Sequence, residues 1–411
     1  MKRIFILITL IALLSVTSTM LFANGQKDSG AEQSKVTFWL ADYEGIDHDY
    51  VKEIEAAFEA ENPQYDLELL VVDWNALNDK LTTSLAAGTP PDASIIGTRW
   101  ILEYMDLDAI VPPKDYVSQS TFDNIAPGAM EAVIDGTLWG IPFAAGSRFL
   151  AINTSLTDKV PSTMEELEQY AKEATKDGNY GLIMPGAKHS ELTDFAYYFY
   201  SAGGDFFDAD GKSAVNSPAG VKALEFMVKL ANEDKVVQDG FMSQSRKQAQ
   251  PIFMGGKAAY VMIGAWADTE YNKMNADWDI KYGQIPPFAG NDPAPLIITD
   301  SIALFKDGKN LEGVGKFIDF LYQDKWKAPL DKQMGFPPVT ITAAQRPEFQ
   351  TPMYAAMAEA NLHAKGWPLV TNWPEISSIV WDANQKALMG QLSAKDALDE
   401  AAAAIDALMG K

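Results

Sequence analysis

The fold is set by a stretch that begins Lys35-Val36-Thr37-Phe38-Trp39-Leu40, an apolar run typical of a buried strand. Residues 49–61 follow with Val51, Ile54 and Phe58 at helical spacing, and Asn62-Pro63 ends that segment. The same alternation continues with a strand at 67–72, a helix at 75–87 and a strand at 93–96. This β-α-β-α-β order predicts an α/β fold whose sheet is mostly parallel and flanked by helices.

The pattern resumes in the second half of the chain. Strands are predicted at 180–184, 257–263 and 280–285, and helices at 165–174, 193–202, 218–232, 312–322 and 394–409. Without its first 23 residues the 411-residue chain keeps 388, which is more than one hydrophobic core normally holds. No Pro/Ser-rich linker separates two halves. We therefore expect two domains joined by more than one crossing segment, an arrangement that makes a hinge and a cleft.

The N-terminus has the pattern of a secretory signal. Lys2 and Arg3 precede an apolar run over residues 4–14, and Leu21-Phe22-Ala23 fits a cleavage site after Ala23. The alternative is an uncleaved anchor, although the run is short of the roughly 20 apolar residues of a membrane span. Residues 1–23 are predicted to be a signal peptide and 24–34 a flexible leader, which implies export to a periplasm.

Composition excludes several classes of function. The chain has no cysteine, so disulfides, thiol catalysis, iron–sulfur clusters and a lipid anchor on cysteine are all ruled out. The net charge of −23 makes binding to nucleic acid or to an anionic membrane surface unfavourable. We expect neither a cofactor nor a metal ion.

Catalytic patterns are weak. The three histidines, His48, His189 and His363, have no zinc-binding spacing, and no Gly-x-Ser-x-Gly motif is present. A carboxylate pair for glycoside hydrolysis is always conceivable among 56 acidic residues, so a secreted glycosidase stays open as a remote alternative. The sequence favours a binding protein over an enzyme.

Aromatic and charged residues follow four predicted strands. They are Asp42-Tyr43-Glu44, Asp73-Trp74, Gly97-Thr98-Arg99-Trp100 and Gly264-Ala265-Trp266. In open α/β sheets, ligands bind beyond the carboxyl ends of the strands. A sugar needs an aromatic face for its ring and polar partners for its hydroxyl groups, and these segments offer both. Each tryptophan could instead be part of the core.

Six segments, in order, resemble those of one protein family. They are Val36-Thr37-Phe38-Trp39, Gly88-Thr89-Pro90-Pro91-Asp92, Leu138–Phe143 with Leu150–Asn153, Pro161–Leu167, Phe253–Tyr260 and Gly390–Leu398. The chain resembles the extracellular solute-binding proteins of ATP-binding-cassette (ABC) importers, in the sugar-binding family that includes maltose-binding protein. The resemblance implies a monomer that closes on a carbohydrate by hinge bending and hands it to membrane permease subunits. Ile152 and Met164 depart from the family pattern at positions where packing is expected.

The resemblance also implies two α/β lobes around the cleft. The N-terminal lobe would hold residues 35–145 and 301–332, and the C-terminal lobe 146–300 and 333–411. Crossings are expected near 144–146, 299–301 and 333–335.

The candidate ligand-binding residues come from the strand ends, the crossings and the positions that the resemblance points to. They are Tyr43, Glu44, Asp73, Trp74, Thr98, Arg99, Trp100, Ser147, Arg148, Glu191, Trp266, Asp300 and Trp373. Trp326 and Trp381 lie in helical segments and are predicted to pack in the core. A polyol, a glycerol phosphate or another solute remains an alternative ligand. A phosphate would favour clustered cations and helix N-termini, and only Arg99 and Arg148 are evident.

Overall fold

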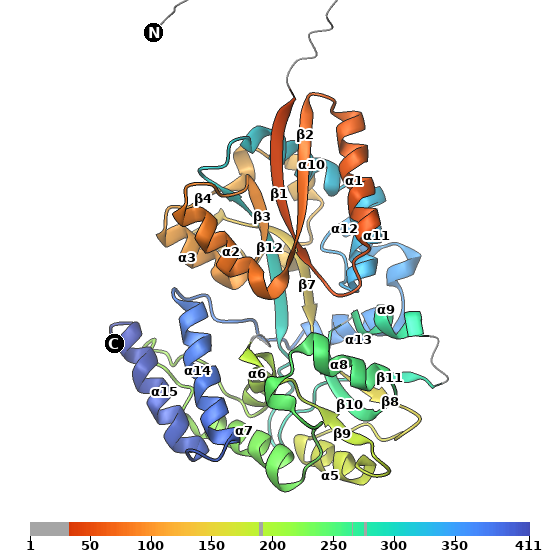
Figure 1. Ribbon diagram of the computed structural model, residues 1–411, viewed down its shortest axis with the longest axis vertical. Helices are drawn as coiled ribbons and strands as arrows, with labels where there is room; N and C mark the ends of the chain where they lie inside the picture. Colours follow the sequence, from red (N-terminus) through yellow and green to blue (C-terminus); the bar gives the residue numbers. More distant parts are fainter. Residues whose placement is uncertain (1–32, 189–191, 265, 275–277) are drawn as a thin grey trace, which may run out of the picture.

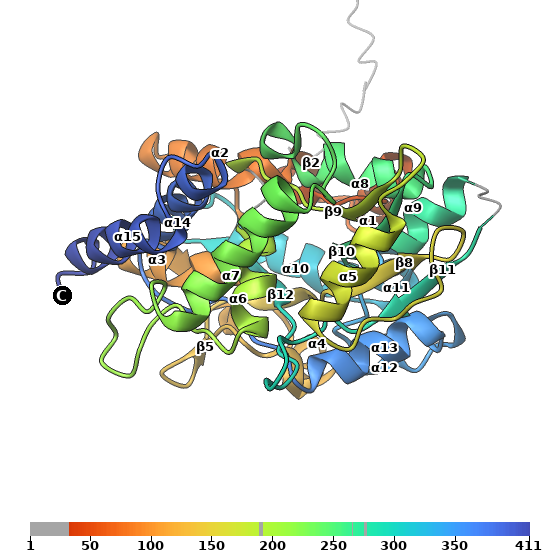
Figure 2. The ribbon, with the colours of Figure 1, turned by 90° about the horizontal axis from the view of Figure 1, so that it is seen from below.

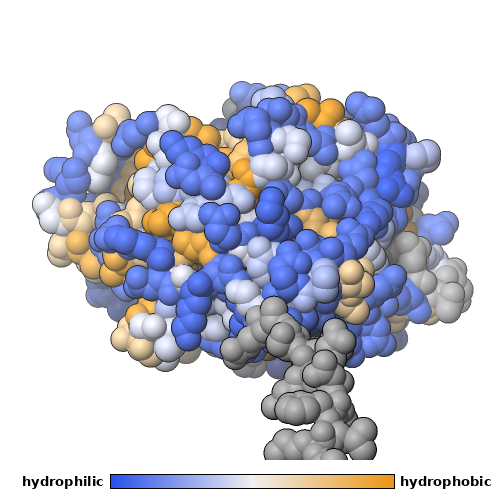
Figure 3. All heavy atoms as spheres, turned by 90° about the horizontal axis from the view of Figure 1, so that it is seen from above, coloured by the Kyte–Doolittle hydropathy of each residue, from blue (hydrophilic) through white to orange (hydrophobic). Residues whose placement is uncertain are grey.

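The computed structural model describes residues 33–188, 192–264, 266–274 and 278–411. The predicted signal peptide lies outside the described residues, as does all of the leader except its last two residues. Figure 1 shows two halves, each built around its own sheet, with β7 and β12 running from one half into the other. The surface seen from above is mostly hydrophilic with small hydrophobic patches (Figure 3), as the strongly negative composition suggests.

The first sheet has the strand order β2-β1-β3-β12-β4, with β7 paired to β12. Its strands are β1 (Ser34–Asp42), β2 (Tyr65–Asp73), β3 (Ala93–Gly97), β4 (Ile110–Val111), β7 (Ile141–Ser147) and β12 (Ile297–Phe305). The helices of this half are α1 (His48–Glu61), α2 (Trp74–Ala86), α3 (Ile101–Asp106), α4 (Gln119–Asp123), α10 (Leu311–Leu321), α11 (Asp324–Met334) and α12 (Ile341–Ala344).

The second sheet has the order β11-β8-β10-β9. Its strands are β8 (Phe149–Asn153), β9 (Tyr180–Ile183), β10 (Ala258–Ile263) and β11 (Ile280–Gly283). The helices of this half are α5 (Met164–Ala174), α6 (Thr193–Ser201), α7 (Pro218–Val228), α8 (Arg246–Met254), α9 (Trp266–Met274), α13 (Pro352–Asn361), α14 (Trp373–Leu388) and α15 (Ala394–Leu408). Figure 2 shows α7, α14 and α15 packed together at one end of this half. A small hairpin joins β5 (Val133–Ile134) and β6 (Thr137–Leu138).

Helix α1 illustrates how the local sequence sets these elements. The side chain of Asp47 caps its first turn by accepting from the Asp49 amide, and Asn62 ends it. Val51, Ile54 and Phe58 are buried as the spacing predicts, and Phe58 packs edge-on against Phe317 of α10. The predicted α/β class with helix-flanked sheets is confirmed.

The sheets are mixed, however, and the expectation of mostly parallel sheets needs correction. Strands β2 and β3 both run parallel to β1, but β12 is antiparallel to β3, β4 and β7. The reason is that β12 returns from the second half and enters the first sheet at the edge where β1, β2 and β3 end. In the second sheet only β9 and β10 pair in parallel.

Two of the expected crossings lie side by side in the pairing of β7 with β12. Ala144 pairs with Asp300 and Ala145 with Thr299, and a bulge falls between Asp300 and Ser301. A bulge bends a strand and increases its twist, which suits a segment that leaves one half for the other.

The third expected crossing, 333–335, coincides with the end of α11, where Gly335 has a φ of 75°. Thr340 still bridges to Ile125, and Thr342 still hydrogen-bonds Asn124, so the chain there keeps contact with the first half. These contacts favour a crossing after residue 342, and the lobe boundaries as a whole stay a prediction.

No helix in the described part of the chain combines the length and apolar character needed to cross a bilayer. Within the same residues, no group of three histidine, aspartate or glutamate side chains is arranged to hold a metal ion.

Candidate functional site

The ends of β1, β2 and β3 bring the first group of candidate residues together. Asp42 and Asp73 are direct partners in the β1–β2 register, so the residues that follow them share one edge of the sheet. The rings of Tyr43 and Trp74 are 5.8 Å apart, and those of Trp74 and Trp100 are stacked at 5.5 Å. The expectation that the strand ends cluster their aromatic side chains is therefore met on this side of the molecule.

Arg99 is held against this aromatic group. Its guanidinium lies 5.0 Å from the centre of the Trp100 ring and 5.7 Å from that of Trp74, and the residue is buried. Gly97 makes the placement possible, because a Cβ atom there would lie 2.5 Å from Arg99 Nη1. A guanidinium fixed on aromatic faces is a planar donor with little freedom left to lose on binding.

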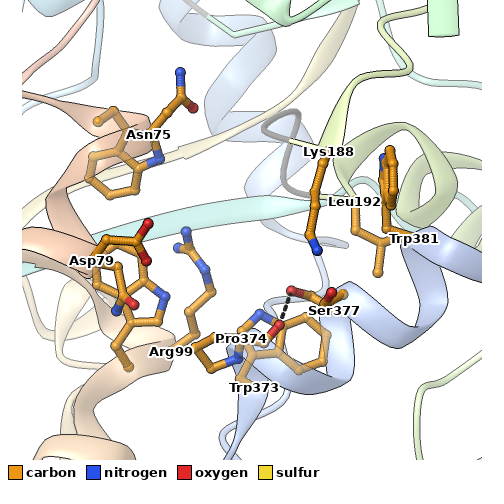
Figure 4. A pocket seen from close by; sticks show the side chains of 13 residues that line it. Asn75, Asp79, Arg99, Lys188, Leu192, Trp373, Pro374, Ser377 and Trp381 are labelled. Carbon is orange, nitrogen blue, oxygen red and sulfur yellow. Dashed lines mark hydrogen bonds between the residues drawn. The ribbon is translucent and has the colours of Figure 1, made fainter. Parts of the chain in front are cut away.

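A cavity of about 230 Å³ opens beside this group, between α2 and α14 (Figure 4). Of the candidates, it is lined by Trp74, Arg99, Trp100 and Trp373. Residues that were not among the candidates complete it: Asn75, Asn78, Asp79, Lys188, Leu192, Pro374, Ser377, Ser378 and Trp381. Figure 4 shows side chains of α2 facing those of α14 across the space, so both halves of the molecule contribute. We call it the first cavity.

A second, smaller cavity of about 20 Å³ lies next to it and shares Trp74. It is lined by the candidates Tyr43, Glu44, Arg148, Trp266 and Asp300, and also by Asp42, Arg246, Ile298, Met334 and Phe336. The Tyr43 hydroxyl donates to Asp300 Oδ2 at 2.9 Å, which links the end of β1 to the bulge in β12. This second cavity thus adjoins the paired crossing segments.

Trp266 lines the second cavity from the side of the second half. It is buried, and its indole N–H donates to Gln250 Oε1 at 3.0 Å. The guanidinium of Arg148 lies 4.4 Å from its ring centre and that of Arg246 lies 5.3 Å away. A sugar ring could stack here only where these cations leave the indole uncovered.

Charges from the two halves meet across the cleft. Lys247 Nζ of α8 lies 3.1 Å from Asp73 Oδ2 and 3.5 Å from Asp42 Oδ2, at the ends of β2 and β1. Arg246 Nη2 lies 3.6 Å from Glu44 Oε1. Burial raises the pKa of the nearby Asp194 carboxyl to about 8, although the positive charge of Arg246 acts in the opposite direction. Lys247 and Arg246 of the second half are thus paired with carboxylates of the first half.

The other candidates lie outside the linings of these two cavities. Asp73 caps α2 by accepting from the Asn75 amide at 3.0 Å. The Thr98 hydroxyl is 2.8 Å from that of Ser301, and the Ser147 hydroxyl donates to Asn361 Oδ1 at 2.6 Å. Ligand contact by these three stays a prediction, as it does for Glu191, which lies outside the described residues.

Sequence reasoning missed the residues that helices supply. Arg246, Lys247 and Gln250 all come from α8, and Trp381 lines the first cavity instead of packing wholly in the core as predicted. Trp381 is eight residues after Trp373, which places both on one face of α14. That spacing was the available signal.

Comparison with known proteins gives consistent results. The family model described as bacterial extracellular solute-binding protein matches residues 45–328. A binding protein of Brucella abortus (strain 2308) is 31% identical over 93% of this chain and 95% of its own length. The sn-glycerol-3-phosphate-binding periplasmic protein UgpB of Rhizobium meliloti (strain 1021) is 24% identical over 95% of this chain and 96% of its own. The structure of maltose-bound MalE3 of T. maritima superposes with a TM-score of 0.81 and 23% identity, over 91% of this chain and all of that one.

Proposed function

Because the chain belongs to the bacterial extracellular solute-binding protein family, whose members are binding proteins and not enzymes, we propose that it captures a carbohydrate for an ABC importer. It would bind a mono- to oligosaccharide between its halves, close by hinge bending and present the closed form to the permease. We further propose that it works as a monomer in the periplasm after cleavage behind Ala23.

The observation that carries this proposal is the composition of the first cavity. Four tryptophans from both halves line it, namely Trp74, Trp100, Trp373 and Trp381. Amide, hydroxyl and carboxylate groups of Asn75, Asn78, Asp79 and Ser377 stand among them. Apolar ring faces alternating with donors and acceptors are what a sugar requires, since each sugar ring has an apolar face and a rim of hydroxyl groups.

Closure would follow from the placement of these groups. Trp74 and Trp100 belong to the first half, and Trp373 and Trp381 belong to α14 of the second half. A ligand that contacts both pairs gains its full set of contacts only when the halves are together. Such a ligand shifts the population toward the closed form by its differential affinity for that form.

A glycerol phosphate or other anionic solute is the second candidate. Arg99 and Lys188 line the first cavity, and the whole-length similarity to a glycerol-3-phosphate-binding protein points the same way. Against it, Asp79 shares that lining, and Glu44 and Asp300 accompany the arginines of the second cavity. The balance of charge favours a neutral polyhydroxyl ligand.

A thermal-shift screen of the purified protein separates the two. The screen would cover mono-, di- and oligosaccharides, polyols and glycerol 3-phosphate. A ligand present at 100 times its Kd should add about 2.7 kcal/mol to the free energy of unfolding. We expect a rise in Tm with one sugar class. A rise only with glycerol 3-phosphate or a polyol would keep the binding role and replace the substrate, and no rise with any carbohydrate or polyol would refute the carbohydrate proposal.

Two half-buried tryptophans on helices provide a test variant and a matched control for locating the ligand. Trp381 lines the first cavity, whereas Trp326 packs on Phe320 and Tyr50 in the first half, away from both cavities. With the sugar that the screen identifies, Trp381→Leu should weaken binding roughly 2- to 10-fold through loss of the aromatic contact. Trp326→Leu should leave the Kd unchanged, and equal losses in both variants would place the ligand elsewhere.

A further inference from the structure

A third cavity of about 250 Å³ continues the cleft on the far side of Trp266. It shares Glu44 and Trp266 with the second cavity, which in turn shares Trp74 with the first. Its remaining lining comes from the turn after β1 and from α8 and α9: Gly45, Lys247, Gln250, Pro251, Met254, Glu270 and Met274. Each cavity therefore adjoins the next through a shared tryptophan, Trp74 and then Trp266.

Two buried polar atoms beside this third cavity lack hydrogen bonds to any described residue. One is Gln250 Nε2, whose side-chain oxygen already accepts from the Trp266 indole. The other is Glu44 Oε1, whose ion-pair contact with Arg246 Nη2 at 3.6 Å is too long for a hydrogen bond. Gln250 is only 5% exposed, and buried donors without partners are rare in folded proteins because they lose water without compensation.

One is a donor and the other an acceptor, and they come from opposite halves of the molecule. Gln250 lies on α8, and Glu44 follows β1. A hydroxyl group both accepts and donates, so a single hydroxyl can satisfy an amide N–H and a carboxylate together. A phosphate or carboxylate would satisfy Gln250 but would be repelled by Glu44 and Glu270 on the same cavity, and Lys247 on that lining already pairs with Asp42 and Asp73.

We propose that this third cavity is a hydroxyl-binding subsite, in which Gln250 and Glu44 hold a sugar unit beside Trp266. The inference rests on the proposed carbohydrate function and extends it to ligand length. The third cavity adds a place for a further sugar unit to that of the first, so we infer that the preferred ligand is a chain of linked sugar units and not a monosaccharide. The second cavity between them is about 20 Å³ in this structure and has to widen for such a chain to pass Trp74 and Trp266. Because Glu44 and Gln250 belong to different halves, a sugar unit whose hydroxyl groups contact both would also help to hold the closed form.

The test uses length series of four neutral glycans from one to six units: α-1,4-glucan, β-1,4-glucan, β-1,4-mannan and β-1,4-xylan. Affinities for the full protein are measured by calorimetry for the wild type, Gln250→Leu and Gln250→Glu. Both variants remove the amide donor, and the second keeps an oxygen that can accept from Trp266. Gln169→Leu, on α5 and exposed, is the matched control.

In the series that binds, we expect affinity to rise with length in the wild type. Both Gln250 variants should lose roughly tenfold for the longer members and nothing for the single unit, while Gln169→Leu should match the wild type throughout. Equal affinity of wild type and Gln250 variants at every length overturns the subsite and leaves the carbohydrate function standing. A wild type that binds none of the glycans, but binds glycerol 3-phosphate, overturns both.

Discussion

The two walls of the cleft are built by different means. The wall of the first half is made by residues that follow β1, β2 and β3, including the first turns of α2, and the rings of Tyr43, Trp74 and Trp100 pack against one another. The wall of the second half is made mainly by helices, with Arg246 and Gln250 on α8 and Trp373 and Trp381 on α14. Trp266, just beyond the end of β10, is its main strand-end contribution. Parallel strands that end together deliver side chains to one edge, whereas a mostly antiparallel sheet leaves that task to the helices around it.

The largest expected effect comes from adding a methyl group at one glycine in each wall, Gly264 in the second and Gly97 in the first. A Cβ at Gly264 would overlap the Trp266 ring and approach Arg148 Nη1 to 2.5 Å. Trp266 is buried and cannot move aside, so Gly264→Ala should lower the free energy of unfolding by about 3 kcal/mol. At Gly97 the three atoms nearest to an added Cβ all belong to the guanidinium of Arg99, which can shift at the expense of part of its contact with Trp74 and Trp100, so Gly97→Ala should cost about 1 kcal/mol.

Urea unfolding of both variants provides the measurement. If Gly97→Ala proved as destabilising as Gly264→Ala, the first wall would be as rigid as the second and the contrast would fail. A matched control is Gly136→Ala, where no atom lies within 4 Å of the added Cβ but φ is 77°, so any loss there reports backbone strain and not crowding.

The same contrast explains what could be predicted from the sequence. Of the residues predicted from the ends of β1, β2 and β3, five line a cavity, because strand direction fixes where the next residue lies: Tyr43, Glu44, Trp74, Arg99 and Trp100. Asp73 and Thr98, predicted on the same ground, line neither the first nor the second cavity. Helix boundaries were also predictable to within a few residues, since apolar spacing and capping residues determine them. The antiparallel course of β12 could not be predicted, because it depends on the chain's return from the other half.

The second wall resisted prediction for a related reason. A helix presents many faces, and only tertiary packing decides which one meets the cleft. The polar residues at the start of α8 look like those of any exposed helix start; they are Arg246, Lys247 and Gln250. The capping box formed by Ser245 and Gln248 supports that interpretation. Trp381 was assigned to packing because its helical context alone does not distinguish a tryptophan in a cavity wall from one in a core, and only its spacing from Trp373 indicated the cavity.

The next effect concerns pH. Burial raises the pKa of Asp194, on α6 of the second half, to about 8, so its carboxyl is protonated in the folded protein at pH 7 but ionised in the unfolded chain. Folding then takes up a proton, and stability falls as pH rises between about 4 and about 8. Asp194→Asn should flatten that part of the stability profile measured by urea unfolding.

Asp73 of the first wall should behave in the opposite way. Partial burial acts to raise the pKa of its carboxyl, but the hydrogen bond from Lys247, its positive charge and the amides at the start of α2 outweigh this and lower the pKa. The stability that Asp73 contributes is therefore present above the unfolded-state pKa and lost as the solution is acidified. Two results would contradict this difference in pKa. One is a pH–stability profile that is the same in Asp194→Asn as in the wild type. The other is a loss of stability on acidification that is as large in Asp73→Asn as in the wild type.

The smallest effect tests the charges that join the walls. Asp42 and Asp73 are direct register partners with like charges, and Lys247 from the other half lies within 3.5 Å of both. These groups are partly exposed, so Lys247→Met should cost about 1 kcal/mol at low salt and almost nothing in 1 M NaCl. Lys395→Met removes an ion pair within α15 and serves as the control. It should cost less, because Lys395 pairs with Asp399 alone, whereas Lys247 lies between two carboxylates that are neighbours in the sheet.

A double-mutant cycle of Lys247→Met with Asp73→Asn measures the coupling free energy of the pair between the walls. If that value equals the coupling of Lys395 with Asp399, the pair contributes no more than an ordinary surface ion pair.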